Sequence, residues 1–174
     1  MTSIVVADAG PLHYLVLVDC ADILEKLFDQ VLVPYAVRDE LLQLNTPETV
    51  KTWIRRPPPW LKVERVTNVQ PIHGLHPGEV EALQLALRAK ALGVLMDDLD
   101  GRKAARQLGL SVIGTIGLLE RAAEKRLIKL PDAVARLRQT NFFIAPELLD
   151  QLLERDRLRH EQTRQIQKDP GIER

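Results

Sequence analysis

Short apolar runs alternate with longer amphipathic segments along most of this chain. Four runs have the length of strands that are buried on both faces, at residues 4–7, 31–33, 94–96 and 111–113. The segment 61–66 alternates only in part, which predicts an edge strand. Because continuous apolar runs are typical of parallel sheets that are covered on both faces, the pattern predicts a buried parallel sheet.

The segments between these runs have the spacing of amphipathic helices. Residues 79–92 are the clearest case, because apolar side chains recur there every three or four residues along one stripe. Asp19 is expected to cap a helix, and Pro34 to occupy a first helical position. The other expected helices span residues 12–18, 21–28, 34–44, 47–55, 100–108, 116–125, 130–139 and 146 onward.

Strands that alternate with helices in this way indicate an α/β domain with a parallel sheet and helices on both of its faces. We expect residues 1–145 to form this domain and residues 146–174 to form a C-terminal helix and a polar tail. Beyond Arg155 almost every residue is polar. The tail is therefore expected to be a solvated helix or partly disordered, with a frayed end from Asp169 onward.

Composition narrows the class of protein. The 174 residues suit one domain, and 24 basic side chains balance 24 acidic ones, whereas nucleic-acid binders often have a basic excess. Cys20 has no second cysteine to pair with, and the sequence shows no signal peptide and no apolar run that could span a bilayer. We expect a cytoplasmic protein without membrane contact. Gly109, Gly114 and Gly117 fit neither the dinucleotide fingerprint nor a P-loop, so no nucleotide cofactor is expected.

Five carboxylates are placed to meet at one edge of the predicted sheet. Asp8 follows the first strand, and Asp97 and Asp98 follow the strand at residues 94–96. Ligands of parallel α/β sheets bind at these carboxyl ends. Glu40 and Glu79, which lie in neighbouring helices, could project toward the same edge. Each acid alone has a structural interpretation as a turn former, a helix cap or part of a solvated face, and only their joint placement favours a site.

Carboxylates that converge need a counter-charge. Two of them about 4 Å apart repel by about 4 kcal/mol at an effective dielectric of about 20. Because the histidines show no metal-ligand spacing and no cysteine lies nearby, an all-oxygen site favours Mg²⁺ or Mn²⁺ over zinc. Such an ion keeps water ligands, can activate one of them and can neutralise a phosphate, which is the chemistry of phosphodiester hydrolysis.

The acids lie in stretches that resemble PIN-domain nucleases. They look like one branch in particular, the short bacterial and archaeal PIN-like proteins related to the toxins of VapC-type toxin–antitoxin pairs. The resemblance covers roughly residues 4–143, in order and with sensible spacing. The matching stretches are residues 6–12, 33–41, 78–86, 95–98, 101–102 and 112–119.

This resemblance implies a three-layer α/β/α fold around a central, roughly five-stranded parallel sheet. It implies a Mg²⁺- or Mn²⁺-dependent endoribonuclease that hydrolyses RNA phosphodiesters, forms homodimers and, as the toxin of a pair, is inhibited by a cognate antitoxin protein. By position, Asp8, Glu40, Glu79 and Asp98 are the expected catalytic acids and metal ligands. Asp97 is a further expected metal ligand, and either it or Asp98 is the direct one.

Two more residues are expected to contact the substrate. Thr115 lies where a hydroxyl of the family contacts metal-bound water or phosphate. Arg102 lies beside the acidic edge and could hold a phosphate, although a solvated helix face explains it equally well. Two positions depart from the family pattern: Gly10 stands where many members have Ser or Thr, and Glu79 is one methylene longer than the common aspartate.

Two other functions remain open from the sequence. A catalytically weak PIN scaffold that binds RNA or a protein is the main alternative: the intact set of acids argues against it, and the departures at Gly10 and Glu79 keep it open. A signalling receiver domain also combines a parallel sheet, aspartates and Mg²⁺. It requires a paired acid near the first strand and a lysine after the fifth, whereas this sequence has Asp8 alone and no lysine following Ile113.

Overall fold

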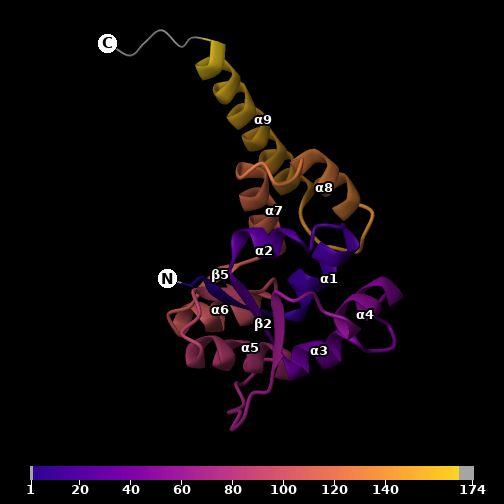
Figure 1. The fold of residues 1–174 in the computed structure, drawn as a ribbon, viewed down its shortest axis with the longest axis vertical. Coiled ribbons are helices and arrows are strands. Elements are labelled where there is room, and N and C mark those ends of the chain that lie inside the picture. The colour runs from indigo at the N-terminus through magenta and orange to yellow at the C-terminus, as the bar shows by residue number, and fades with distance from the viewer. Residues whose placement is uncertain (1, 169–174) are drawn as a thin grey trace. The chain divides into compact units, whose positions relative to one another are not determined.

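The computed structural model describes residues 2–168, and Figure 1 labels its helices and strands. The chain divides into two compact units, which are called unit 1 (Met1–Leu118) and unit 2 (Leu119–Arg174). The division falls inside α7 (Thr115–Glu124), nearer the N-terminus than the boundary at residue 145 that the sequence suggested. The fraying expected from Asp169 onward lies outside the described residues.

Unit 1 is built on a sheet of five strands that all run parallel, in the order β3-β2-β1-β4-β5. The strands are β1 (Ile4–Ala7), β2 (Gln30–Pro34), β3 (Leu61–Glu64), β4 (Gly93–Leu95) and β5 (Ser111–Ile113). The expected α/β fold with a five-stranded parallel sheet is confirmed. The strand that alternates only in part, β3, lies at an edge of the sheet, as its pattern predicted.

The helices of unit 1 follow the predicted order but differ at their ends. The helix expected over residues 79–92 begins at Pro77 and ends at Arg88, and Lys90 just beyond it has a left-handed backbone with φ 49°. Pro34 ends β2 and precedes the first helical residue instead of occupying it. Asp19, with φ 56°, does not precede the next helix directly. The helices are α1 (Ala9–Leu17), α2 (Ile23–Leu27), α3 (Tyr35–Leu41), α4 (Glu48–Arg55), α5 (Pro77–Arg88) and α6 (Leu99–Gln107).

Both faces of the sheet are covered. Val6 is in register with Leu32 on one side and Val94 on the other, so all three point to the same face, where they share a core with α5 and α6. Successive residues of a strand point to opposite faces. Val5 and Val31 therefore face the other side, and they too are fully buried. There α1 packs on α3 and α4, and α2 packs on β2, which completes the three predicted layers.

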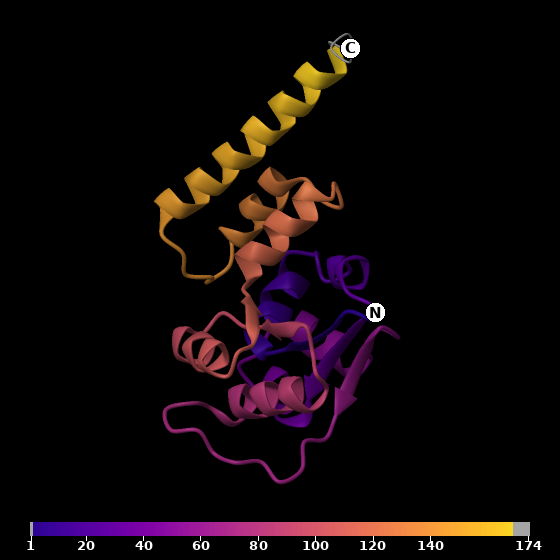
Figure 2. The same ribbon diagram turned by 90° about the vertical axis from the view of Figure 1, so that its left-hand side faces the viewer.

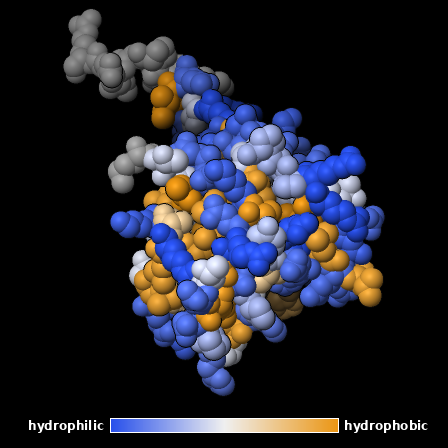
Figure 3. All heavy atoms as spheres, turned by 60° about the horizontal axis from the view of Figure 1, so that its bottom comes forward, coloured by the Kyte–Doolittle hydropathy of each residue, from blue (hydrophilic) through white to orange (hydrophobic). Residues whose placement is uncertain are grey.

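The surface of unit 1 around α5 mixes hydrophilic and hydrophobic residues (Figure 3). Leu87 of α5 and Leu92 beyond it are 44% and 58% exposed. Single exposed leucines are common on globular proteins and need no special function. In the part of the chain that the structure describes, none of the helices is long and apolar enough to cross a membrane.

In unit 2, α8 (Leu130–Leu137) packs against α9 (Pro146–Lys168), and ion pairs connect α9 to the end of α7. Arg155 and Arg159 of α9 pair with Glu120 and Glu124 of α7 at 3.0 and 3.2 Å. Figure 2 shows α9 extending beyond the other two helices. The polar segment that follows Arg155 is helical as far as Lys168, the last described residue.

Candidate functional site

The strand order creates a switch point between β1 and β4. From β1 the chain adds β2 and β3 on one side, and it then crosses to the other side of β1 to add β4 and β5. The loops at such a point diverge and leave a crevice at the carboxyl ends of the strands. The Asp8 N–H donates to the Leu95 carbonyl at 2.9 Å. Asp8 therefore lies in this crevice, next to the residues that follow β4.

Asp8 is buried and lacks a partner for part of its carboxylate. The residue is only 6% exposed, and its Oδ1 finds no hydrogen-bond donor anywhere in residues 2–168. It stands at the start of α1, but within the same range its side chain does not cap the helix. Buried polar atoms nearly always have a partner. The helix-cap interpretation therefore does not explain this carboxylate.

The surroundings of Asp8 disfavour its charged form. Burial, the largest cause, raises the pKa of Asp8 from 3.8 to about 7. The Ala9 backbone N–H opposes the shift, whereas the negative charges of Glu40, Glu79 and Asp97 add to it. The structure has therefore brought four of the predicted acids close enough to repel one another, an arrangement that is found more often at functional sites than elsewhere.

Gly78 shows how closely Asp8 and Glu40 approach each other. A Cβ at Gly78 would lie 2.9 Å from Glu40 Oε2 and 3.7 Å from Asp8 Oδ1. Both carboxylates therefore border the same small space in front of this glycine, and a larger residue would fill it. Glu40 reaches the space because α3 packs against α5. Burial of its carboxyl raises the pKa of Glu40, and nearby His76 lowers it.

Glu79 has a structural role as well as a place among the acids. It is 7% exposed, and its Oε2 accepts a hydrogen bond of 2.9 Å from the His76 N–H at the start of α5. Burial raises the pKa of Glu79, the His76 N–H lowers it, and Asp98 and Glu40 raise it. The helix-start interpretation thus accounts for one oxygen of Glu79 but not for its proximity to other carboxylates.

Asp97 is held by Thr115. The Thr115 N–H donates to Asp97 Oδ1 at 2.7 Å, and the Thr115 hydroxyl donates to Oδ2 at 2.6 Å. Gly10 borders the same carboxylate, since a Cβ there would lie 3.2 Å from Oδ2. Thr115 is fully buried, and the hydrogen bond that its hydroxyl donates goes to Asp97. In the structure it therefore positions Asp97, which differs from the contact with water or phosphate that the family resemblance implied.

Asp98 caps α6. Its Oδ1 accepts hydrogen bonds of 2.9 and 3.0 Å from two backbone N–H groups in the first turn, and the residue is exposed. The two adjacent acids therefore differ: Asp97 interacts electrostatically with Asp8, and Asp98 with Glu79. The family resemblance favoured Asp98, whereas the geometry places Asp97 closer to buried Asp8.

The guanidinium of Arg102 borders the same glycine as the Asp97 carboxylate: a Cβ at Gly114 would lie 2.6 Å from Arg102 Nη1 and 2.9 Å from Asp97 Oδ1. Arg102 lies at the carboxyl end of β4, where its Nη1 donates to the Met96 carbonyl at 2.9 Å. Of the ion pairs formed within residues 2–168, none includes any of the five predicted acids. Over that range, no three carboxylate, imidazole or thiol groups are arranged as a ready-made metal site. The acids are therefore close enough to interact electrostatically, but they are not arranged to hold a metal ion without some adjustment.

A pocket of about 560 Å³ opens next to these residues. Its lining includes Glu40, which is one of the predicted acids, the neighbouring Gly78, and Asp39, Gln43 and His76. This volume is in the range of sites that bind small molecules or part of a polymer. Glu40 is thus the one predicted acid that lines this pocket among the described residues.

The match to a known family decides the identity of this fold. Over residues 4–157 the sequence matches the family model described as "DUF3368: PIN domain". The chain belongs to the PIN-domain family. PIN domains are generally nucleases, so the chain has a fold of nuclease type. The resemblance to PIN domains that the sequence showed is thereby confirmed at the level of the family, and the VapC-type branch stays a prediction.

Other comparisons add little to the PIN assignment. Among curated proteins there is no match. Among solved structures, the chain is similar to a PilT N-terminus domain protein from the hyperthermophilic archaeon Sulfolobus solfataricus P2. The two share 13% identity with a TM-score of 0.47, over 82% of this chain and 99% of that one.

Two residues of this PIN site were missed by sequence reasoning. His76 was dismissed because it lacks metal-ligand spacing, yet it lies between Glu40 and Glu79 and affects the pKa of both. Its position just before Pro77 at a helix start was the signal that could have placed it. Gly78 is the second, and nothing in its sequence context indicates that α3 passes over it.

Proposed function

We propose that this PIN-domain protein is a Mg²⁺- or Mn²⁺-dependent endoribonuclease that hydrolyses RNA phosphodiesters. We further propose that it acts as the toxin of a VapC-type pair, as a homodimer that a cognate antitoxin inhibits. One observation carries the nuclease proposal: Asp8 keeps a buried, unpartnered carboxylate oxygen among other acids. Buried polar atoms nearly always have a partner, and a cation bound by Asp8 would supply one.

The donor set fits a hard divalent cation. Asp8, Glu40, Glu79 and Asp97 offer only oxygen atoms, which Mg²⁺ and Mn²⁺ prefer. The unpartnered Oδ1 of Asp8 and the space in front of Gly78 meet at one place. A cation held by these residues would supply an activated water and charge neutralisation at the phosphate.

The protein's own residues prepare this site. Thr115 fixes both oxygens of Asp97, and the His76 N–H fixes one oxygen of Glu79. Each keeps one carboxylate in place despite the repulsion of its neighbours. Arg102, which is anchored to the Met96 carbonyl through one nitrogen, has further N–H groups that can donate to a phosphate oxygen.

A cleavage assay tests this proposal. Fluorescently labelled single-stranded RNA should be cut in Mg²⁺ or Mn²⁺ and left intact in EDTA. Asp8→Asn should lower the rate by about 100-fold or more, because a uniquely placed ligand is lost. Asp22→Asn, a change of the same kind at an exposed position of unit 1, should leave the rate unchanged. Full activity in EDTA, or wild-type rates for Asp8→Asn, would refute the proposal.

The toxin role needs its own test. Expression of the wild-type chain should arrest bacterial growth, and expression of Asp8→Asn at the same level should not. Growth arrest by both chains would separate toxicity from the acidic site and contradict this part of the proposal.

One observation favours a second function, a PIN scaffold that binds RNA or protein without efficient cleavage. Within residues 2–168 the acids do not form a ready-made metal site, and Asp98 is engaged as a helix cap. Tight RNA binding without turnover in either Mg²⁺ or Mn²⁺ would select this alternative.

A further inference from the structure

Unit 2 contains a groove that plays no part in the acidic site. Its volume is about 760 Å³, and it lies between α9 and the turn that joins α7 to α8. Every residue that lines it belongs to unit 2. Its chemistry can therefore be considered independently of the proposed nuclease.

The floor of the groove is aliphatic. Leu127, Ile128, Leu130 and Pro131 contribute from the turn and the start of α8, and Leu153 contributes from α9. Leu127 is 40% exposed. A concave surface of this kind gains free energy when a partner covers it with apolar side chains.

The rim of the groove carries uncompensated positive charge. Arg126, Lys129 and Arg164 line it, and none of them takes part in an ion pair between residues of the described range. Arg157 of the lining is already paired with two glutamates, and His160 lies 3.7 Å from Asp156.

The acids of the same lining do not balance this excess. Glu161 pairs with Arg157, and buried Asp156 is close to Arg159 and His160. This leaves Asp132, in the first turn of α8, where the helix dipole favours a negative charge. Within residues 2–168, the three cations Arg126, Lys129 and Arg164 and the single carboxylate Asp132 of the lining thus remain outside any ion pair.

We propose that this groove binds an acidic amphipathic helix of a partner protein. Leucine-like side chains on one face of such a helix would cover the aliphatic floor. Its glutamates and aspartates would face Arg126, Lys129 and Arg164. A helix that places an apolar stripe in a groove is a recurrent mode of recognition, and complementary charge at the rim selects the partner.

The lining favours protein over RNA as the occupant. Surfaces that bind single-stranded nucleic acid combine cations with aromatic rings on which bases stack. The residues that line this groove include His160 but no Phe, Tyr or Trp among those the structure describes. An aliphatic floor suits aliphatic side chains, so the positive rim is assigned to carboxylates and not to phosphates.

A synthetic helix serves as the probe. It is a fluorescein-labelled peptide of about five turns with leucines on one face and glutamates on the other. A second peptide carries lysine in place of every glutamate. We expect the full-length protein to bind the glutamate peptide at least about tenfold more tightly than the lysine peptide in fluorescence anisotropy, and increasing salt to reduce the difference.

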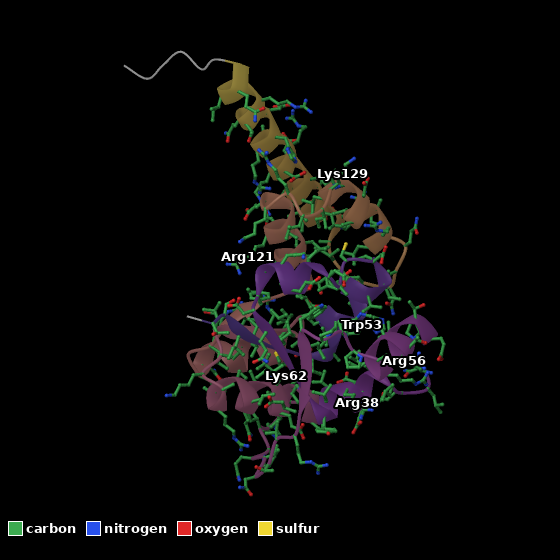
Figure 4. All side chains as sticks on the ribbon, viewed as in Figure 1. Arg38, Trp53, Arg56, Lys62, Arg121 and Lys129 are labelled. Carbon is green, nitrogen blue, oxygen red and sulfur yellow. The ribbon has the colours of Figure 1, made fainter. Side chains whose placement is uncertain are left out.

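Paired charge reversals locate the binding surface. Lys129→Glu/Arg164→Glu should weaken binding of the glutamate peptide by about tenfold or more. The control is Arg121→Glu/Lys125→Glu, which makes the same charge change at two exposed residues of unit 2 outside the groove lining. Figure 4 labels Arg121 and Lys129, which lie on different sides of unit 2. The control should change affinity by less than about twofold.

Further variants separate binding from folding. Lys129→Gln/Arg164→Gln should give an intermediate loss, and circular dichroism should show unchanged helix content for all variants. Asp8→Asn should bind the peptide as the wild type does, because its site lies in unit 1. Equal binding of both peptides, or equal effects of the groove and control variants, would overturn the proposal. So would binding of single-stranded oligouridylate that depends on Lys129 and Arg164 when the glutamate peptide does not bind.

Discussion

Asp8 in unit 1 and Asp156 in unit 2 are both buried aspartates, at 6% and 4% exposure, but their surroundings are opposite. Asp156 Oδ1 lies 3.2 Å from the Arg159 guanidinium, and its Oδ2 lies 3.7 Å from the His160 imidazole, so both of its oxygens have a nitrogen group nearby. Asp8 is surrounded by carboxylates, and one of its oxygens has no partner in the described chain. Burial alone therefore does not distinguish a functional acid from a structural one.

The difference lies in what each carboxylate still requires. A buried carboxylate that is paired has its desolvation cost offset by its partners within the fold. A buried carboxylate without a partner raises the free energy of the folded state unless it takes up a proton or binds a cation. This comparison predicts opposite responses of the two units to matched substitutions.

The largest expected effect concerns stability at high pH. Because the folded-state pKa of Asp8 is about 7 against 3.8 when unperturbed, the folded chain holds a proton that the unfolded chain releases between these values. The stability contribution of Asp8 therefore falls as pH rises from about 4 to 7. Asp8→Asn should remove this loss and raise the free energy of unfolding by up to about 4 kcal/mol at pH 8 in EDTA. Urea unfolding at pH 4 and pH 8 measures it, and the same pH dependence in both proteins would contradict the interpretation.

Removing the buried carboxylate of unit 2 should act in the other direction. Asp156→Ala takes away one partner of Arg159 and the neighbour of His160, and we expect a loss of about 2 kcal/mol in the free energy of unfolding. The loss is moderate because Arg159 is partly exposed and keeps its pairs with Glu120 and Glu124. RNA cleavage by the folded variant should equal that of the wild type. A variant as stable as the wild type would show that this pair is not structural.

A smaller effect concerns cation affinity. Protons would compete with the proposed Mg²⁺ for Asp8, so the apparent affinity for Mg²⁺ should rise with pH by up to about tenfold per unit below pH 7 and level off above it. Calorimetric titration of the wild type at several pH values measures this slope. Asp156→Ala should keep the slope. An affinity that is independent of pH would place the cation away from Asp8.

The smallest expected effect compares two threonine hydroxyls. Thr115 donates to Asp97, whereas Thr163 donates to the Arg159 carbonyl within α9. Thr115→Val should cost about 1 kcal/mol of stability, and it should also slow cleavage, because Asp97 loses a fixed orientation. Thr163→Val should leave cleavage unchanged. Equal cleavage rates for the two variants would remove Thr115 from the site.

The sequence was informative where a residue depends on its own element. Asp8 and Asp97 were placed correctly at the ends of β1 and β4, because an apolar run followed by a turn defines a strand end. Helix ends were less accurate. The helix expected to reach residue 92 stops at Arg88, since the left-handed residue Lys90 ends the periodic segment before its apolar pattern ends.

Residues whose role depends on two elements could not be predicted. The space at Gly78 exists only because α3 passes over α5 and brings Glu40 to it. Thr115 and Asp97 are 18 residues apart, and the sequence does not indicate which hydrogen bond they make. The charge imbalance of the groove was also hidden, because pairing within α9 decides which cations remain free.

The sequence by itself determined the alternation of strands and helices, and hence which acids stand at the carboxyl edge of a parallel sheet. Local hydrophobic periodicity and turn chemistry are sufficient for that. Only the tertiary structure decided which of those acids are neighbours, which are satisfied by the fold and which one remains buried without a partner. Electrostatic and hydrogen-bond energies depend on distances across elements, and these distances exist only once the helices have packed on the sheet.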